Sequence, residues 1–266
     1  MKPLTRVFFA VVALVGLATG AVLLSAPGST ADYFPWPVNP PQTAVFLGAG
    51  YLGTGITLLL MLLLARSWAE MRLIVPPIVV FALAMIGATL LHADRFLWDR
   101  PVTWIWLGLY GVVVLGCVVV GLIERGQRRA RIGVGLMPGE RIVLVVIGLL
   151  TLGWAAPMYV APDFGLLVWP WGLTHLTARV VAGWIAVGAT LALVGGEAND
   201  ARGIRLAMLG WVITAALFLL SSVLNLAAFT DDVKRAIFFT GLAASIYGAL
   251  WLLVRVQRRV AIAPLS

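Results

Sequence analysis

The sequence predicts an all-α integral membrane protein, a helical bundle of eight transmembrane helices built as two tandem parallel four-helix repeats. Three observations predict this fold. Of 266 residues, 62% are hydrophobic and only 11% are charged, which is too little polar surface for a water-soluble globule of this length. Eight apolar runs are long enough to span the hydrocarbon core of a bilayer. The second half of the chain also repeats the first.

The apolar runs lie in order along the chain, and the sixth is the shortest. They cover roughly 7–25, 44–65, 73–91, 102–123, 142–161, 180–195, 206–227 and 236–254. Each run is apolar on all sides, whereas the strands of a membrane barrel alternate with period two, so helices are expected. The first run resembles a secretory signal, but the same pattern recurs at 141–162, where no signal can lie. We therefore expect the first helix to stay in the mature protein.

The repeat is visible in two ungapped alignments. Residues 6–55 match 141–190 at an offset of 135 with 12 identities in 50 pairs, and residues 72–111 match 205–244 at an offset of 133 with 9 in 40. Chance would give about one match in ten positions or fewer in a chain of this composition. The sequence thus predicts a first repeat over 1–123, a basic cytoplasmic linker over 124–140 and a second repeat over 141–266.

Charge placement predicts the orientation of the helices. With a cytoplasmic N-terminus, 14 of the 19 Lys and Arg residues fall on the cytoplasmic side and 5 on the other. This distribution follows the positive-inside rule and predicts a multi-pass protein of the cell inner (plasma) membrane with both termini in the cytoplasm. The basic residues are explained by topology and anionic lipid, so no nucleic-acid partner is expected.

The loop after the first helix of each repeat is rich in proline and tryptophan. Residues 26–43 read APGSTADYFPWPVNPPQT, and residues 161–179 read APDFGLLVWPWGLTHLTAR. Proline at this density disfavours helix, and tryptophan is enriched at the headgroup level, so each loop is expected to form a stiff cap on the outer membrane surface. Two interpretations stay open: Trp36 and Trp171 anchor an aromatic belt, or they roof an outward-facing vestibule between the repeats.

The segment WPWGLTHLTARVVAGW at 169–184 resembles a WPW, LT, LTAR segment of an uncharacterised family of polytopic bacterial membrane proteins. The resemblance implies a bacterial membrane protein and supplies no chemistry. The first repeat departs from it, with Pro37 in place of Gly172 and Pro40 in place of His175.

Motifs for catalysis, cofactors or metals are weak. GAGYLG at 48–53 satisfies the GxGxxG expression, but it lies inside an apolar run with no preceding strand, so close helix packing explains it better than a dinucleotide site. His92 and His175 do not align with each other in the repeat, and no further ligand lies at a suitable spacing. We expect no cofactor and no metal, and we assign no catalytic residue.

The polar groups inside the apolar runs are hydroxyls and one amide, with no charged side chain well inside a run. Ionisable groups at mid-membrane are typical of proton relays, so a proton-driven pump is disfavoured. The remaining groups are expected to join helices or to line a mildly polar cavity. They are Tyr51, Thr54, Thr57, Thr89, Tyr110, Thr151, Thr190, Thr214, Ser221, Ser222, Asn225, Thr240, Ser245 and Tyr247.

The best candidate site is predicted at the outer ends of the third and seventh helices. Acidic and basic residues interleave there, and Asp99 aligns with Asp232 in the repeat, so a structural latch and a two-fold binding site are both consistent with the pattern. The candidate vestibule comprises Trp36, His92, Asp94, Asp99, Trp171, His175, Arg179, Asn225 and Asp232.

Three functions remain open. The favoured one is a structural or accessory subunit of a membrane assembly, because the loops are small and motifs are lacking. The second is a binder or carrier of a small apolar or amphipathic molecule, such as a lipid, quinone or pigment, in the outward-facing vestibule. The third is a membrane-embedded enzyme that uses the outer His and Asp residues. The expected partners are the lipid bilayer and either other membrane proteins or such a ligand.

Overall fold

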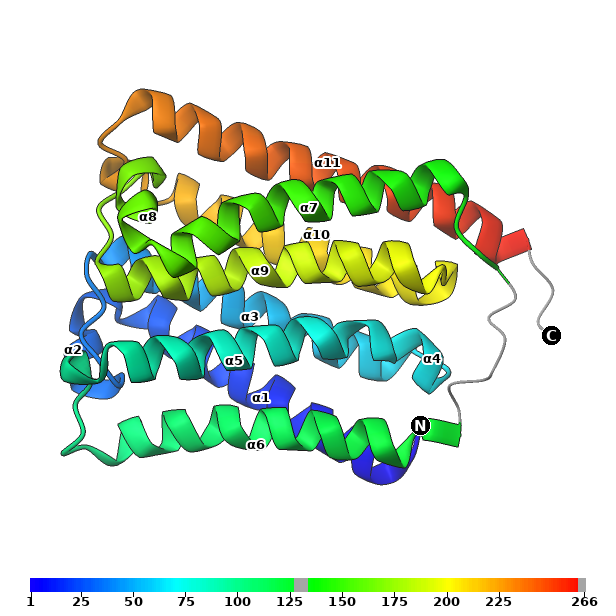
Figure 1. The fold of residues 1–266 in the computed structure, drawn as a ribbon, viewed down its shortest axis with the longest axis horizontal. Helices are drawn as coiled ribbons and strands as arrows, with labels where there is room; N and C mark the ends of the chain where they lie inside the picture. Colours follow the sequence, from blue (N-terminus) through cyan, green and yellow to red (C-terminus); the bar gives the residue numbers. More distant parts are fainter. Residues whose placement is uncertain (127–133, 263–266) are drawn as a thin grey trace.

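The computed structural model describes residues 1–126 and 134–262, and within these ranges the chain is helical without strands (Figure 1). Part of the predicted basic linker, including Arg128, Arg129 and Arg131, lies outside the described residues. Eight segments are long and apolar enough to cross a membrane, which confirms the predicted all-α class and the eight candidate spans. They are α1 (Pro3–Ser25), α3 (Pro41–Leu64), a composite span (Trp68–Leu91), α6 (Pro101–Ile123), α7 (Pro138–Val160), α9 (His175–Ala198), α10 (Ala201–Val223) and α11 (Asp232–Ile262).

The helices begin where local chemistry favours a helix start. Proline stands at the start of α1, α3, α6 and α7, where its missing N–H loses no helical hydrogen bond. α9 is capped by Thr174, whose hydroxyl accepts the N–H of Thr177 (3.2 Å). α9 therefore begins at His175, several residues before the apolar run that predicted it.

The composite span is broken near one end. It consists of α4 (Trp68–Met71), a 3₁₀ turn η2 (Arg72–Ile74) and α5 (Val75–Leu91). Pro76 and Pro77 have no backbone N–H, so they cannot donate α-helical hydrogen bonds to the residues four positions earlier. A 3₁₀ turn accommodates this interruption of the helix. The aligned positions in α10 are Leu209 and Gly210, and α10 is continuous.

The two proline-rich loops contain more helix than the sequence predicted. α2 (Thr30–Tyr33) lies in the first loop and α8 (Pro162–Val168) in the second. Proline excludes helix only from interior positions, and Pro162 is the first residue of α8, so the expectation of fully extended loops is wrong. The stretch Pro35–Pro40 is non-helical, as expected.

The bundle has four central and four peripheral spans. In the 18-residue apolar stretch of each span, 50–56% of the residues are buried for α3, the composite span, α9 and α10, and 11–28% for α1, α6, α7 and α11. α3 packs against α1 and α10, and α9 packs against α7 and α5; α6 covers α5, and α11 covers α10 (Figure 1). Central helices from both halves of the chain thus form the core.

The start of α1 and the end of α11 lie at one end of the bundle, called here the terminal end. The opposite end, with α2 and α8, is called the distal end (Figure 1). Two buried carboxylates tie helices together at the terminal end. Glu124 accepts hydrogen bonds from the Lys2 backbone N–H (2.7 Å) and the Thr5 hydroxyl (2.8 Å). Glu140 pairs with Arg255 (3.5 Å) and Arg259. Each carboxylate joins the first and last spans of its half of the chain.

Candidate binding cavity

Trp36 and Trp171, the two tryptophans of the predicted vestibule, are buried at the distal end. Each is 2% exposed, so neither ring faces lipid. Trp36 packs against the rings of Phe34, Phe96 and Trp106 at centroid distances of 4.7, 5.0 and 5.1 Å. Trp171 packs against a different set: Phe46, Trp169, Phe229 and Phe238. The two indoles therefore share no direct ring neighbour, although both belong to the same hydrophobic core.

His92 and Arg179 are the two predicted site residues that the structure brings into contact with each other. His92 follows α5, and its Nε2 lies 2.5 Å from Nη1 of Arg179 on α9. Burial lowers the pKa of His92, and the neighbouring guanidinium of Arg179 lowers it further. The neutral imidazole accepts a hydrogen bond from Arg179, which links the composite span to α9 at the distal end.

The other predicted residues have separate local partners. His175 contacts Asp163 (2.8 Å), Asp94 contacts Arg95 (3.0 Å), and Asp232 contacts Arg235 (2.7 Å). The side-chain amide of Asn225 donates to the Ser221 carbonyl oxygen (2.9 Å). Asp99 is exposed. Within the described part of the chain, no three His, Cys, Asp or Glu residues are grouped to hold a metal ion. The distal polar residues thus form scattered surface pairs, which contribute little free energy each.

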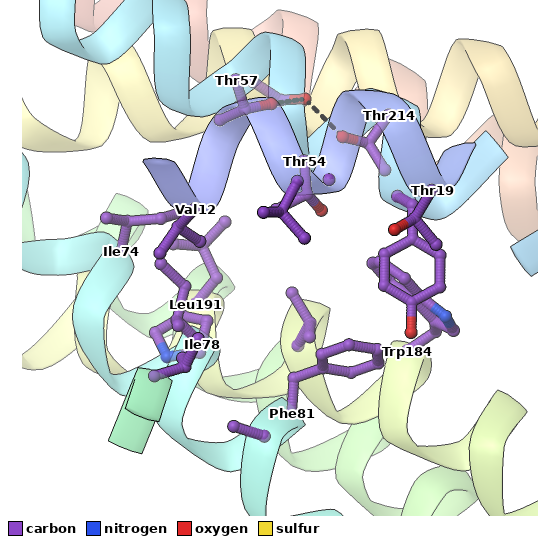
Figure 2. A pocket seen from close by; sticks show the side chains of 18 of the residues that line it. Val12, Thr19, Thr54, Thr57, Ile74, Ile78, Phe81, Trp184, Leu191 and Thr214 are labelled. Carbon is purple, nitrogen blue, oxygen red and sulfur yellow. Dashed lines mark hydrogen bonds between the residues drawn. The ribbon is translucent and has the colours of Figure 1, made fainter. Parts of the chain in front are cut away.

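A cavity of about 120 Å³ lies instead in the middle of the bundle (Figure 2). Six spans border it, four from the first half of the chain and two from the second. On every bordering span except the composite span, the residues that line the cavity come from the central part of the helix. In Figure 2 the labelled side chains surround an open centre: Val12, Thr19, Thr54, Thr57, Ile74, Ile78, Phe81, Trp184, Leu191 and Thr214.

One wall of the cavity is formed by the peripheral helices α1 and α6. These helices meet near the terminal end, where Phe8 lies against Gly116 and Thr5 bonds Glu124. Further along, the lining residues on α1 and one on α6 are only partly buried, whereas the other lining residues on α6 are buried. The partly buried ones are Val12, Val15, Gly16, Thr19 and Leu109, and the buried ones are Trp106, Tyr110 and Val113. Both helices also have exposed apolar side chains on their outer faces.

The lining is apolar, with a few neutral polar groups. Among the described residues that border the cavity, none is charged. Thr57 donates to the Gly53 carbonyl oxygen (2.7 Å), and Thr214 donates to the Gly210 carbonyl oxygen (3.0 Å). These two hydroxyl hydrogens are therefore already bound by backbone carbonyls of their own helices.

The other polar groups are the hydroxyls of Thr19 and Thr54 and the O–H and N–H groups of aromatic side chains. The hydroxyls of Tyr51 on α3 and Tyr110 on α6 lie 2.5 Å apart and form a hydrogen bond. Trp184 on α9 is 4% exposed, and its indole N–H has no hydrogen-bond partner among the described residues. The rings of Tyr51 and Trp184 are in edge contact at a centroid distance of 5.2 Å. The three residues place polar hydrogens in an otherwise apolar environment.

Part of this site could be identified from the sequence. Tyr51, Tyr110, Thr57 and Thr214 belong to the hydroxyl set that was expected to join helices or line a cavity. The sequence did not single out Trp184, because a tryptophan within an apolar run has the same sequence signature whether it faces lipid or the core. The predicted vestibule was placed at the distal end, whereas the cavity lies in the middle of the bundle.

Comparisons with known proteins give no relative. No protein-family model matches the chain, and neither a curated protein nor a solved structure is similar to it. The chemistry of the cavity must therefore be interpreted from its own residues.

Proposed function

We propose that this protein binds a small apolar or amphipathic molecule within the membrane, in the cavity between the two halves of the chain. The cavity itself carries the proposal. Protein interiors are packed with few voids larger than a water molecule. An apolar cavity of about 150 Å³ in another protein holds benzene or xenon, so the 120 Å³ found here suits a ring-sized group.

The partly buried wall between α1 and α6 suggests how such a molecule enters. A hydrophobic ligand partitions into the bilayer, and this wall borders the lipid at the depth of the cavity. A headgroup or ring would occupy the cavity while a longer chain extends between α1 and α6 into the bilayer. This route needs no opening to water at either end of the bundle.

The proposal includes the two-repeat architecture. Three pairs of helix contacts support it: α1 with α3 corresponds to α7 with α9, α5 with α6 to α10 with α11, and α3 with α10 to α9 with α5. This pattern is the one expected when two parallel four-helix units are related by an axis along the membrane normal.

The proposal also includes an orientation and a location. With both termini in the cytoplasm, 14 of 19 basic residues lie on the cytoplasmic side, as the positive-inside rule requires. The protein would then be a multi-pass protein of the inner (plasma) membrane, and the distal end, with α2 and α8, would face outward.

The other two functions receive less support. An accessory-subunit role predicts a stable protein partner, but the exposed apolar faces of the peripheral helices are equally explained by lipid. An enzyme that uses the distal His and Asp residues would need them assembled, and the structure places His92 and His175 in different pairs. We therefore rank the binding function first.

Mass spectrometry of the natively purified protein tests the proposal. The wild type should retain a small apolar molecule in a fixed ratio, and Thr54→Leu, which adds bulk inside the cavity, should lose it. Thr240→Leu makes the same chemical change at an exposed position on α11 and should retain the molecule. A wild type that carries only bulk lipid, or equal retention in both variants, would contradict the binding function. A stoichiometric protein partner without a bound molecule would favour the accessory-subunit role.

A further inference from the structure

We infer that the molecule bound in the cavity is neutral and carries a hydrogen-bond acceptor, such as a carbonyl oxygen, which faces Tyr51, Tyr110 and Trp184. This inference rests on the proposed binding function and specifies its ligand. It follows from counting the hydrogen-bond donors and acceptors that border the cavity.

The tyrosine pair supplies one unused hydrogen. Each phenol carries a single O–H, and the one hydrogen bond between Tyr51 and Tyr110 uses only one of the two hydrogens. Whichever hydroxyl donates, the other keeps a hydrogen that has no further acceptor among the described residues. Both side chains border the cavity, and they are 8% and 5% exposed.

Trp184 supplies a second unused hydrogen. Its indole nitrogen can only donate, and its N–H is buried without an acceptor. Trp106, which also borders the cavity, differs in this respect, because its N–H donates to the Thr89 hydroxyl (3.1 Å). An unpartnered buried donor costs free energy, so a ligand that accepts from it gains affinity.

The rest of the lining excludes a charged ligand. No cation among the described residues borders the cavity, so an anion would be buried there without compensation. A cation is excluded for the same reason, since no carboxylate borders the cavity either. The free donors of the tyrosine pair and Trp184, together with a neutral and largely apolar surface, fit a ketone, quinone, ester or similar oxygen on a hydrophobic molecule.

The positions of the donors also suggest how this molecule lies. Tyr51 and Trp184 project from the central helices α3 and α9, while Tyr110 projects from α6, a peripheral helix of the lipid-facing wall. The acceptor oxygen would lie at the tyrosine pair, and the hydrocarbon part would contact Val12, Val15 and Leu109 on its way to the bilayer.

Two probes of matched shape test the inference on the purified full-length protein. Acetophenone and α-methylstyrene have the same outline, but only acetophenone has a carbonyl oxygen. Binding of each is measured by ligand-dependent thermal stabilisation, and the carbonyl stretch of ¹³C-labelled acetophenone is recorded in parallel. We expect acetophenone to bind about tenfold more tightly, because only it accepts a hydrogen bond, and its carbonyl band to move to lower frequency.

Variants test which side chains donate the hydrogen bond to acetophenone. The double variant Tyr51→Phe/Tyr110→Phe and the single variant Trp184→Phe should each reduce the preference for acetophenone while binding of α-methylstyrene stays the same, because each removes an unused hydrogen. Tyr247→Phe, at a 73% exposed position on α11, should leave the preference unchanged. If one of the two cavity variants fails to fold, the other still removes one of the unused hydrogens and carries the test.

The outcomes separate the two proposals. Equal affinity for the two probes, with an unshifted carbonyl band, would overturn the ligand class and leave the binding function standing. Failure of both probes to bind the wild type would count against the binding function itself. A preference for acetophenone that survives unchanged in Tyr51→Phe/Tyr110→Phe and in Trp184→Phe would also overturn the inference, because the donors would then lie elsewhere.

Discussion

The two halves of the chain pair their helices in the same pattern but differ at their centres. Tyr51 and Tyr110 of the first half align with Ala186 and Ala243 of the second. The phenol pair that borders the cavity therefore has no counterpart in the other half. Trp184 in turn is a feature of the second half alone, since the first half has Ala49 at the aligned position. The matching pattern of helix pairs thus carries an asymmetric set of aromatic hydrogen-bond donors, as the proposed binding of one asymmetric ligand would require.

A second difference concerns the closeness of the first two helices in each half. Gly20 on α1 faces the backbone of α3, and a Cβ placed there would lie 2.6 Å from the Leu52 nitrogen. The aligned position in α7 is Ala155, which is 2% exposed, so the second half accommodates a side chain at the equivalent place. Small residues allow membrane helices to approach closely. At this position the first half relies on a glycine for a close approach of two helices, whereas the second half does not.

The largest expected effect comes from Gly20→Ala. The added methyl group meets backbone atoms that cannot rotate away, so we expect a loss of about 2–3 kcal/mol in the free energy of unfolding. Gly108→Ala on α6 is the matched control, because a Cβ at Gly108 has nothing within 4 Å. Reversible unfolding in mixed detergent micelles measures both. Equal stability of the two variants would show that the α1–α3 contact is looser than described.

A smaller effect distinguishes the two buried carboxylates at the terminal end. Glu140 pairs with two partly exposed arginines, whereas Glu124 bonds neutral N–H and O–H groups on α1. We expect Glu140→Gln to cost about 1 kcal/mol at low salt, because exposure of the arginines weakens the pairs. This cost should shrink as salt rises, while the effect of Glu124→Gln should not depend on salt.

Unfolding at low and high salt measures both glutamine variants. A salt-independent effect of Glu140→Gln would mean that its arginine pairs contribute nothing to stability. A strong salt dependence of Glu124→Gln would point to a cation near that carboxylate, against the neutral donors seen in the structure.

Much of the fold could be predicted from composition and periodicity. Eight apolar runs gave eight spans, because an uninterrupted apolar helix has few alternatives in a membrane. The helix ends were less predictable, since they depend on individual residues such as Thr174. The interruption at Pro76–Pro77 and the short helices in the outer loops also depend on where each proline stands within a turn.

The cavity could be predicted only in part. A tyrosine or threonine within an apolar run is expected to face other helices, which correctly grouped Tyr51 with Tyr110 as inward residues. The same expectation was wrong for Thr240 and Tyr247, which are exposed on α11, because hydroxyl content does not show which side of a helix is covered. The sequence did not show that they meet, because α3 and α6 come into register only through tertiary packing. Burial of Glu124 and Glu140 was equally unpredictable, since a carboxylate at a helix end is normally solvated.

An experimental structure under xenon pressure, after extraction of bound lipid, tests the central claim most directly. Xenon occupies apolar cavities of this size. We predict one strong xenon site bordered by Thr54, Phe81 and Trp184. This site should be lost in Thr54→Leu, and no equivalent site should lie among α7, α9, α10 and α11. Absence of xenon from this cavity, or equal occupancy at equivalent positions in both halves, would contradict the claim that a single cavity distinguishes the two halves.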